Sequence, residues 1–286
     1  MNSFTRDLLI WIEKNLDQKI SLEDVSVRAG YSKWYLQRLF RAETGLTLAS
    51  YIRQRKLYRA AIMLKMTSLS VIEIVDRLGF STQQTFTRTF KRHFGLAPGR
   101  YRESELWDFD GLIPEFTGEY PVLPAPQRIM ASLHTLPGIS LSYNCNSTDL
   151  GNVLLHTEQR QALFRIAGKM PNDVFPISFA AMCEPSSSNA EQINFSLTFA
   201  KVIPEGHTSL DGAAAFLRFP FQGTPEQLTE MQVNIYDHIM PLRREARRTG
   251  HDFFICESKV EPYKGELSFR GGYYIPVTDK KAQIDC

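Results

Sequence analysis

The first hundred residues contain an internal repeat with a period of about 50. Four residues of the first copy recur at an offset of 49 or 50, in the pairs Gly30 and Gly79, Arg38 and Arg88, Phe40 and Phe90, and Gly45 and Gly95. The change of offset places one added residue in the turn of the second copy. Such a repeat constrains the fold strongly, because both copies are expected to form the same supersecondary unit.

The first copy has the signals of a helix, a tight turn and a second helix. Ser21 followed by Asp24 resembles a capping box, which marks a helix start. Gly30 can end this helix with a positive φ, and Ser32 can cap the helix that follows.

The second copy repeats these signals. Ser70 and Glu73 occupy the capping-box positions, apolar residues follow at helical spacing, and Gly79 ends the helix. A helix, a glycine-containing turn and a second helix in each copy predict two helix-turn-helix units. An ordinary αα-hairpin with a solvated face is the alternative for one copy taken alone.

The second helix of each unit is predicted to carry a polar face opposite its apolar one. In the stretch SKWYLQRLF, the apolar face consists of Leu36, Leu39 and Phe40. The polar faces carry Lys33, Trp34, Gln37 and Arg38 in the first unit and Gln83, Gln84, Thr87, Arg88 and Lys91 in the second. Because Gln and Arg can form bidentate hydrogen bonds with adenine and guanine in the major groove, we predict that these residues contact DNA.

Further helices complete the first half. Residues 4–16 predict a core helix, and the run LAPGRYRE predicts a short final helix. A longer helix from Leu48 to about Leu64 joins the two units and would let them meet successive major grooves, roughly 34 Å apart. Four basic residues lie off its apolar face, where they either contact phosphates or are solvated: Arg53, Arg55, Lys56 and Arg59.

The two halves of the chain differ in the sign of their net charge. Residues 1–105 contain 18 Lys and Arg against 10 Asp and Glu, a net charge of +8. The remainder contains 15 Lys and Arg against 21 Asp and Glu, a net charge of −6. A basic half suits a domain that faces phosphates, and an acidic half suits one that does not.

Residues 106–125 are predicted to form a linker, because three prolines and two glycines interrupt any regular pattern. Beyond it, strands are predicted around Pro137-Gly138 and in FPISFAAMCE, INFSLTFAKVI, AAAFLRFPFQG, HDFFICESKV and LSFRGGYYIPV. Helices are predicted from Asp149 to about Lys169 and from Pro225 to about Arg248. The basic cluster RREARR, Arg243 to Arg248, would then lie at the end of the second helix.

These elements follow the order strand, helix, strand, strand, given twice. The order predicts an α+β domain with a duplicated strand-helix-strand-strand module and a largely antiparallel sheet. The predicted architecture is an all-α domain at residues 1–105 with two helix-turn-helix units, a linker at 106–125 and the α+β domain at 126–286.

The chain has four cysteines, namely Cys145, Cys183, Cys256 and Cys286. They form no C-x-x-C pair and no metal-ligand spacing with histidine, so they indicate reduced thiols in a cytoplasmic protein. Arg6, Asp7 and Glu13 interrupt the apolar residues that a signal peptide needs, and no apolar run has the length that spans a membrane. We predict no metal, no cofactor and no enzymatic activity.

The first hundred residues resemble the DNA-binding domain of AraC/XylS-type transcription regulators. The runs SKWYLQRLF and QQTFTRTFKRHFG, and the opening RDLLIWIEKNLDQKISLEDV, are similar to the MarA, SoxS and Rob branch of that family. The resemblance implies an activator of stress or resistance promoters that binds double-stranded DNA as a monomer. It also implies RNA polymerase as a partner.

The second half is similar to the GyrI-like effector-binding domain, in DGAAAFLRFPFQGTPEQL and GGYYIPV. The resemblance implies a cleft for small amphipathic, often cationic, effectors, with a glutamate three residues before the final Ile-Pro. This chain has Gly272 at that position, and Glu257, Glu261 or Glu266 could substitute. We therefore expect either a preference for neutral or weakly polar effectors or only weak binding of cations through aromatic faces, and a higher affinity for lipophilic cations after Gly272→Glu.

Without that glutamate, aromatic side chains are the candidates for the walls of a ligand pocket. The candidates are Tyr143, Phe179, Phe219, Tyr236, Tyr273 and Tyr274, each of which can instead belong to the core. A small-molecule hydrolase and a module that only binds other proteins are the alternative functions for this half.

Overall fold

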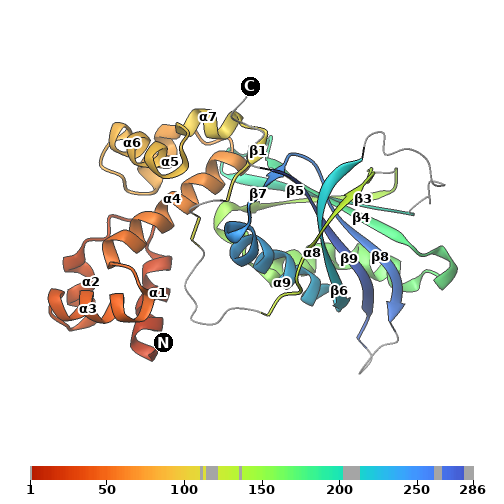
Figure 1. The fold of residues 1–286 in the computed structure, drawn as a ribbon, viewed down its shortest axis with the longest axis horizontal. Helices are drawn as coiled ribbons and strands as arrows, with labels where there is room; N and C mark the ends of the chain where they lie inside the picture. Colours follow the sequence, from red (N-terminus) through yellow and green to blue (C-terminus); the bar gives the residue numbers. More distant parts are fainter. Residues whose placement is uncertain are drawn as a thin grey trace. The chain divides into compact units, whose positions relative to one another are not determined.

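The computed structural model describes residues 2–109, 112–113, 122–134, 137–201, 213–260 and 266–279. The chain divides into two compact units (Figure 1). Unit 1 comprises residues 1–104 and 109–121, and unit 2 comprises residues 105–108 and 122–286. Half of the predicted linker, including residues 114–121, lies outside the described residues.

The regular structure in the described part of unit 1 is helical, as predicted. Its helices are α1 (Ser3–Lys14), α2 (Leu22–Ala29), α3 (Lys33–Thr44), α4 (Leu48–Met66), α5 (Val71–Arg77), α6 (Gln83–Phe94) and α7 (Pro98–Glu103). Helices α2 and α3 form the first helix-turn-helix unit and α5 and α6 form the second, with α4 between them (Figure 1).

Helices α2 and α5 begin at the residues predicted to cap them; α2 also ends at the predicted Gly30, whereas the C-cap of α5 is Leu78, one residue before the predicted Gly79. Ser21 and Asp24 form a reciprocal capping box at the start of α2, and Ser70 and Glu73 form the same box at the start of α5. Gly30 ends α2 with a φ of 68°, in the left-handed region that favours glycine. Local side-chain chemistry therefore sets both turns.

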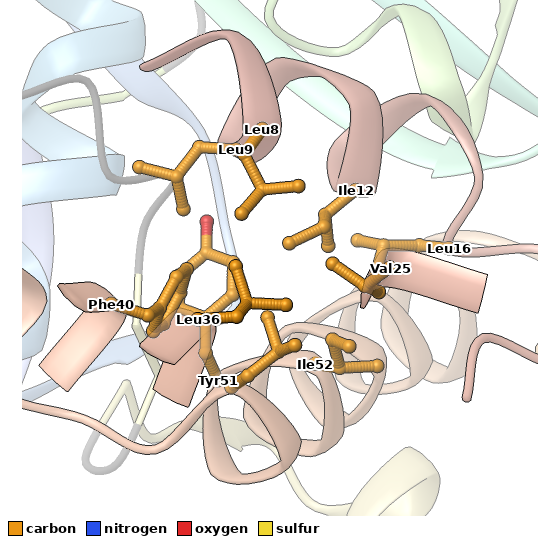
Figure 2. Close-up of a cluster of buried hydrophobic side chains, with 10 residues drawn as sticks. Leu8, Leu9, Ile12, Leu16, Val25, Leu36, Phe40, Tyr51 and Ile52 are labelled. Atoms are coloured by element: carbon orange, nitrogen blue, oxygen red, sulfur yellow. The ribbon is translucent and has the colours of Figure 1, made fainter. Parts of the chain in front are cut away.

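A buried hydrophobic cluster holds the first helix-turn-helix unit against α1 and α4. Figure 2 shows Leu8, Leu9 and Ile12 of α1 facing side chains from the following helices. The cluster is completed by Leu16, Val25, Leu36, Phe40, Leu48, Tyr51 and Ile52. Burying a side chain of this size stabilises a fold by about 1.5–3 kcal/mol. The apolar faces of α2 and α3 therefore pack in this core, and their other faces are left for solvent or a partner.

Polar side chains of α4 also enter the interior. Arg55 donates hydrogen bonds from Nε and Nη2 to the Glu13 carboxylate of α1, at 2.8 and 3.0 Å. Tyr51 Oη donates to the same carboxylate at 2.8 Å, and Arg59 donates to the Glu13 carbonyl oxygen at 2.6 Å. The remaining nitrogen of Arg55, Nη1, donates to the carbonyl oxygen of Ile113 at 2.6 Å. This hydrogen bond ties residues 112–113 to α4.

The prediction that the basic residues of α4 contact phosphates or are solvated is wrong for two of the four. Arg55 and Lys56 are only 5% and 7% exposed, Arg59 is half-buried, and Arg53 is exposed. The physical reason is that α4 packs against other helices over most of its circumference, so a cation can lie off the apolar stripe and still be buried. Each buried cation finds oxygen acceptors inside the unit.

Unit 2 is built on an antiparallel sheet. Its strands are β1 (Leu106–Trp107), β2 (Gln127–Ala131), β3 (Ile139–Asn146), β4 (Ile177–Pro185), β5 (Gln192–Lys201), β6 (Ala214–Gly223), β7 (Glu245–Arg248), β8 (Asp252–Val260) and β9 (Ser268–Asp279). They pair in the order β2-β6-β9-β8-β4-β5-β3, while β7 pairs with β9 and with β1. The halves β3-β5-β4 and β6-β9-β8 meet at the pairing of β4 with β8.

Two helices, α8 (Val153–Lys169) and α9 (Pro225–Asn234), accompany this sheet (Figure 1). The ring of Phe164 in α8 lies 4.7 Å from that of Phe179 and 5.8 Å from that of Phe269. The core of unit 2 therefore lies between α8 and the sheet face that carries these two residues. We call this face the helix face and the other face the open face.

The prediction that α9 continues to about Arg248 is wrong. The α-helix ends at Asn234, a π-helix follows at Ile235–Ile239, and a 3-10 turn follows at Met240–Leu242. Pro241 lacks a backbone N–H and cannot continue a helix. The basic cluster therefore enters strand β7, where Glu245 and Ala246 are buried.

Candidate nucleic-acid interface and candidate ligand site

Helix α3 presents the predicted contact residues to solvent. Leu36 and Phe40 are 0% and 1% exposed and anchor the helix, which Ser32 caps. The remaining predicted residues, Lys33, Trp34, Gln37 and Arg38, are all exposed. An exposed apolar ring beside an amide and two cations is a surface that can meet both base edges and phosphates.

Trp34 and Arg38 form one element of this surface. The Trp34 side chain is 69% exposed, and the Arg38 guanidinium lies 5.5 Å from its ring centroid. A cation–π contact of this kind holds the guanidinium beside the exposed ring. Lys33, in contrast, is already paired with Glu23 of α2.

Helix α6 repeats this arrangement in the second unit. Phe86 and Phe90 are fully buried and belong to a chain of aromatic rings that reaches Tyr101 of α7. The predicted contact residues Gln83, Gln84, Arg88 and Lys91 are exposed, and Thr87 is half-buried. Thr82 caps the helix, one residue later than the serine that opens this stretch.

Lys56 of α4 connects the loop before the first helix-turn-helix unit to the second helix-turn-helix unit. Lys56 Nζ donates to the carbonyl oxygens of Gln18 and Leu78, both at 2.6 Å. A Cβ on Gly79, whose φ is 62°, would lie 3.1 Å from the backbone of Gln18. The loop after α1 and the end of α5 are therefore in close contact, which fixes one helix-turn-helix unit relative to the other.

The six residues considered for the walls of a ligand pocket lie on both faces of the sheet. Tyr273 and Phe219 are register partners and share the helix face, where Tyr143 also lies beside Phe195. Tyr236 of the π-helix and Tyr273 both donate hydrogen bonds to the carboxylate of Asp252. Tyr274 is the next residue along β9 and lies on the open face, so the six candidates do not line a single pocket.

On the helix face, four side chains form a buried polar cluster. Tyr236 and Tyr273 donate to Asp252 Oδ2 at 2.5 and 2.6 Å. Arg247 donates to Asp252 Oδ1 and to Tyr236 Oη, each at 2.9 Å. Burial, with the nearby Asp252 charge, raises the pKa of both tyrosines well above its usual value. These phenols are therefore hydrogen-bond donors at neutral pH.

On the open face, Arg218 occupies the space beside Gly272. A Cβ at Gly272 would lie 2.9 Å from Arg218 Nε. Arg218 donates to Tyr274 Oη at 3.1 Å and pairs with Glu257 at 3.3 Å. Of the three glutamates considered as substitutes, Glu257 is thus neutralised by an arginine, Glu266 is exposed, and Glu261 lies outside the described residues.

An apolar cluster adjoins this arginine on the open face. Phe216, Phe253 and Ala180 are buried there, with Ile255 and Tyr274 packed against them. The Arg218 guanidinium therefore lies between Gly272, where the resemblance implied a glutamate, and an apolar patch of the open face.

The three cysteines in the described part of the chain are buried or half-buried free thiols. Cys145, Cys183 and Cys256 are free thiols, and burial raises their pKa to about 11, about 12 and about 12. Cys286 lies outside the described residues. The described ranges contain no group of three potential metal ligands and no helix long and apolar enough to cross a membrane.

Comparisons with known proteins agree with the geometry. A family model described as a helix-turn-helix domain matches residues 25–104. The right origin-binding protein of Escherichia coli K12 is 31% identical over 258 residues, which cover 86% of this chain and 88% of that protein. Transcriptional regulator Rob of Salmonella typhimurium is 31% identical over 286 residues, covering 95% of this chain and 97% of the relative. Multiple antibiotic resistance protein MarA of E. coli K12 is 48% identical over 99 residues, which cover 35% of this chain and 78% of MarA.

Proposed function

Because this chain belongs to the AraC family of DNA-binding transcription regulators, in the branch that contains Rob and MarA, we propose that it activates promoters by binding them as a monomer. The observation that carries the proposal is the pair of exposed polar faces on α3 and α6, held in one compact unit. The relative MarA is a multiple antibiotic resistance protein, which supports resistance or stress promoters as targets. An activator of this kind recruits RNA polymerase as its partner.

In this proposal α3 and α6 enter successive segments of the major groove. Arg38 and Gln37 read base edges, and Trp34 contributes apolar contacts beside them. Arg88 and Gln84 have the corresponding roles in α6. The remaining predicted residues, Lys33, Gln83, Thr87 and Lys91, contact phosphates or flanking bases and set the register.

The two helix-turn-helix units differ in sequence, so the DNA site has no need of two-fold symmetry. Two recognition helices one helical turn apart span about 20 base pairs. Selection of bound duplexes from a random pool tests this directly. The enriched site should be asymmetric, with two sequence blocks about one turn apart; enrichment of a palindrome would contradict binding as a monomer.

We further propose that unit 2 is a GyrI-like effector domain made of two related modules. The strand orders β3-β5-β4 and β6-β9-β8, each with one helix after its first strand, support such a duplication. Its effector is amphipathic and not cationic, and it lies on the open face near Tyr274, because Arg218 holds the position of the family glutamate.

The position of Arg218 beside Gly272 changes the expected result of Gly272→Glu. The new carboxylate would lie beside Arg218 and pair with it, so the variant should bind a tetraarylphosphonium cation no better than wild type. Gly272→Glu combined with Arg218→Ala should bind the cation about tenfold more tightly, a difference of about 1.4 kcal/mol. Calorimetry with this cation and a neutral molecule of similar shape measures both effects. A rise in cation affinity with the single change would refute the role given to Arg218.

A further inference from the structure

Arg160 of α8 is a buried cation on the helix face of unit 2. It is 8% exposed, and its guanidinium lies 5.9 Å from the ring centroid of Phe195. Its Nε donates to Tyr143 Oη at 3.1 Å, and its Nη1 donates to Gln232 Oε1 of α9 at 2.8 Å. The side chain thus lies between α8, α9 and strands β3 and β5.

The hydrogen-bond partners of Arg160 carry no negative charge. His156 Nε2 lies 3.1 Å from the carbonyl oxygen of Leu150, so this nitrogen bears the proton. His156 Nδ1 then accepts from Tyr143 Oη at 2.8 Å, and Tyr143 Oη in turn accepts from Arg160. Burial and the Arg160 charge lower the pKa of His156 to about 4, and burial raises the pKa of Tyr143, so both are neutral at pH 7.

The other titratable groups nearby do not neutralise Arg160 either. The high pKa values of Cys145 and Cys183 keep both thiols protonated. Asp252 is paired with Arg247 at 2.9 Å, and Asp149 accepts a hydrogen bond from Asn146. Within the described ranges, Arg160 takes part in no ion pair.

Two other buried arginines show the contrast. Arg55 pairs with Glu13 at 2.8 Å and Arg247 pairs with Asp252 at 2.9 Å. Arg160 has no such carboxylate among the described residues, and its Nη2 donates no hydrogen bond to them. A buried cation without a counter-charge is strongly unfavourable, which indicates that an anion from outside the protein completes this site.

An external anion can reach the guanidinium. Nη2 of Arg160 makes no hydrogen bond to the described residues and is not fully buried, so solvent contacts it. The neighbouring Gln232 lies in the last turn of α9, directly before the π-helix at Ile235–Ile239. Single turns of π-helix are frequent at functional sites.

We propose that Arg160 anchors a site for a small organic carboxylate, with Gln232 and Tyr143 holding the guanidinium in place. One arginine matches the single charge and planar geometry of a carboxylate. The stacked rings of Tyr143 and Phe195, 5.4 Å apart, offer an apolar neighbour for the body of such a ligand. This site lies on the helix face and is distinct from the Gly272 region, so its existence does not depend on the effector proposed for the open face.

Calorimetry on the full chain in chloride-free buffer tests this site, with benzoate as the probe and benzamide as its neutral isostere. Wild type should bind benzoate at least tenfold more tightly than benzamide. Arg160→Gln should lose this preference, and Arg160→Lys should keep part of it because the charge remains. Arg165→Gln, which changes an exposed arginine of the same helix, should bind like wild type.

Three results would overturn the proposal. The first is equal binding of benzoate and benzamide by wild type, and the second is unchanged benzoate binding by Arg160→Gln. The third is binding of inorganic phosphate as tightly as benzoate, which would contradict the assignment to carboxylates. The free energy of unfolding without ligand separates a binding role from a structural one. In chloride-free buffer Arg160→Gln should be at least as stable as wild type. A less stable variant would show that Arg160 is a structural residue and would contradict the proposal.

Discussion

Replacing Glu13 by alanine is expected to lower the free energy of unfolding of unit 1 by about 3–5 kcal/mol, the cost of breaking a buried ion pair from one side. The Glu13 and Arg55 side chains are 6% and 7% exposed, and the carboxylate accepts three hydrogen bonds from Arg55 and Tyr51. The change removes the acceptor but leaves the arginine buried. Because Arg55 also donates a hydrogen bond to the carbonyl oxygen of Ile113, residues 112–113 should loosen together with α1.

Denaturant unfolding followed by the fluorescence of Trp11 and Trp34 measures this loss, since both residues lie in unit 1. Replacing Glu13 and Arg55 together by methionine should restore most of the stability, because no charge is then left unpaired. Glu23→Ala is the matched control: it breaks the Lys33–Glu23 pair, whose side chains are 53% and 60% exposed, and should change stability by less than about 1 kcal/mol. An equally small effect of Glu13→Ala would contradict the importance given to the buried pair.

Replacing Arg38 by alanine is expected to remove sequence discrimination, at a cost of about 1–3 kcal/mol on the selected DNA site. A bidentate contact to a guanine is lost on that site but is never formed on a scrambled duplex. Affinity for the scrambled duplex should therefore fall much less. The fold should be unaffected, because Arg38 is exposed and lies beside the Trp34 ring, which is itself exposed.

Fluorescence anisotropy with the selected and scrambled duplexes measures both affinities. Arg53→Ala is the matched control, because Arg53 is an exposed arginine of unit 1 outside both recognition helices. If it contacts a phosphate, its loss should weaken both duplexes by a similar factor. An equal loss on both duplexes for Arg38→Ala would instead make Arg38 a phosphate contact.

The sequence predicted unit 1 well because its signals are local. A capping box such as Ser21 with Asp24, or a glycine with positive φ such as Gly30, acts within a few residues. Amphipathic spacing then separated the buried Leu36 from the exposed Arg38 on the same helix. These features need no knowledge of distant contacts.

The sequence did not predict which cations of α4 are buried, because that depends on partners far along the chain. Arg55 is 42 residues from Glu13, and Lys56 is 38 residues from Gln18. No periodicity connects such residues, and only the packing of α4 among its neighbours brings them together. The uncompensated charge of Arg160 was missed for the same reason.

The sequence also failed where one residue overrides a long pattern. The run after Pro225 reads as one long helix, but Pro241 interrupts it and the chain turns into β7. In the candidate pocket, Tyr273 and Tyr274 were treated together although adjacent strand residues lie on opposite faces. Register with β6 separates them: Tyr273 pairs with Phe219, and Tyr274 pairs with Arg218.

The central claim is that one chain reads DNA with both helix-turn-helix units at once. Sedimentation velocity of the full chain on the selected duplex of about 20 base pairs tests it most directly. The account predicts one protein per duplex, with the complex weakened when either sequence block is scrambled. Two proteins per duplex, or full affinity after one block is scrambled, would contradict it.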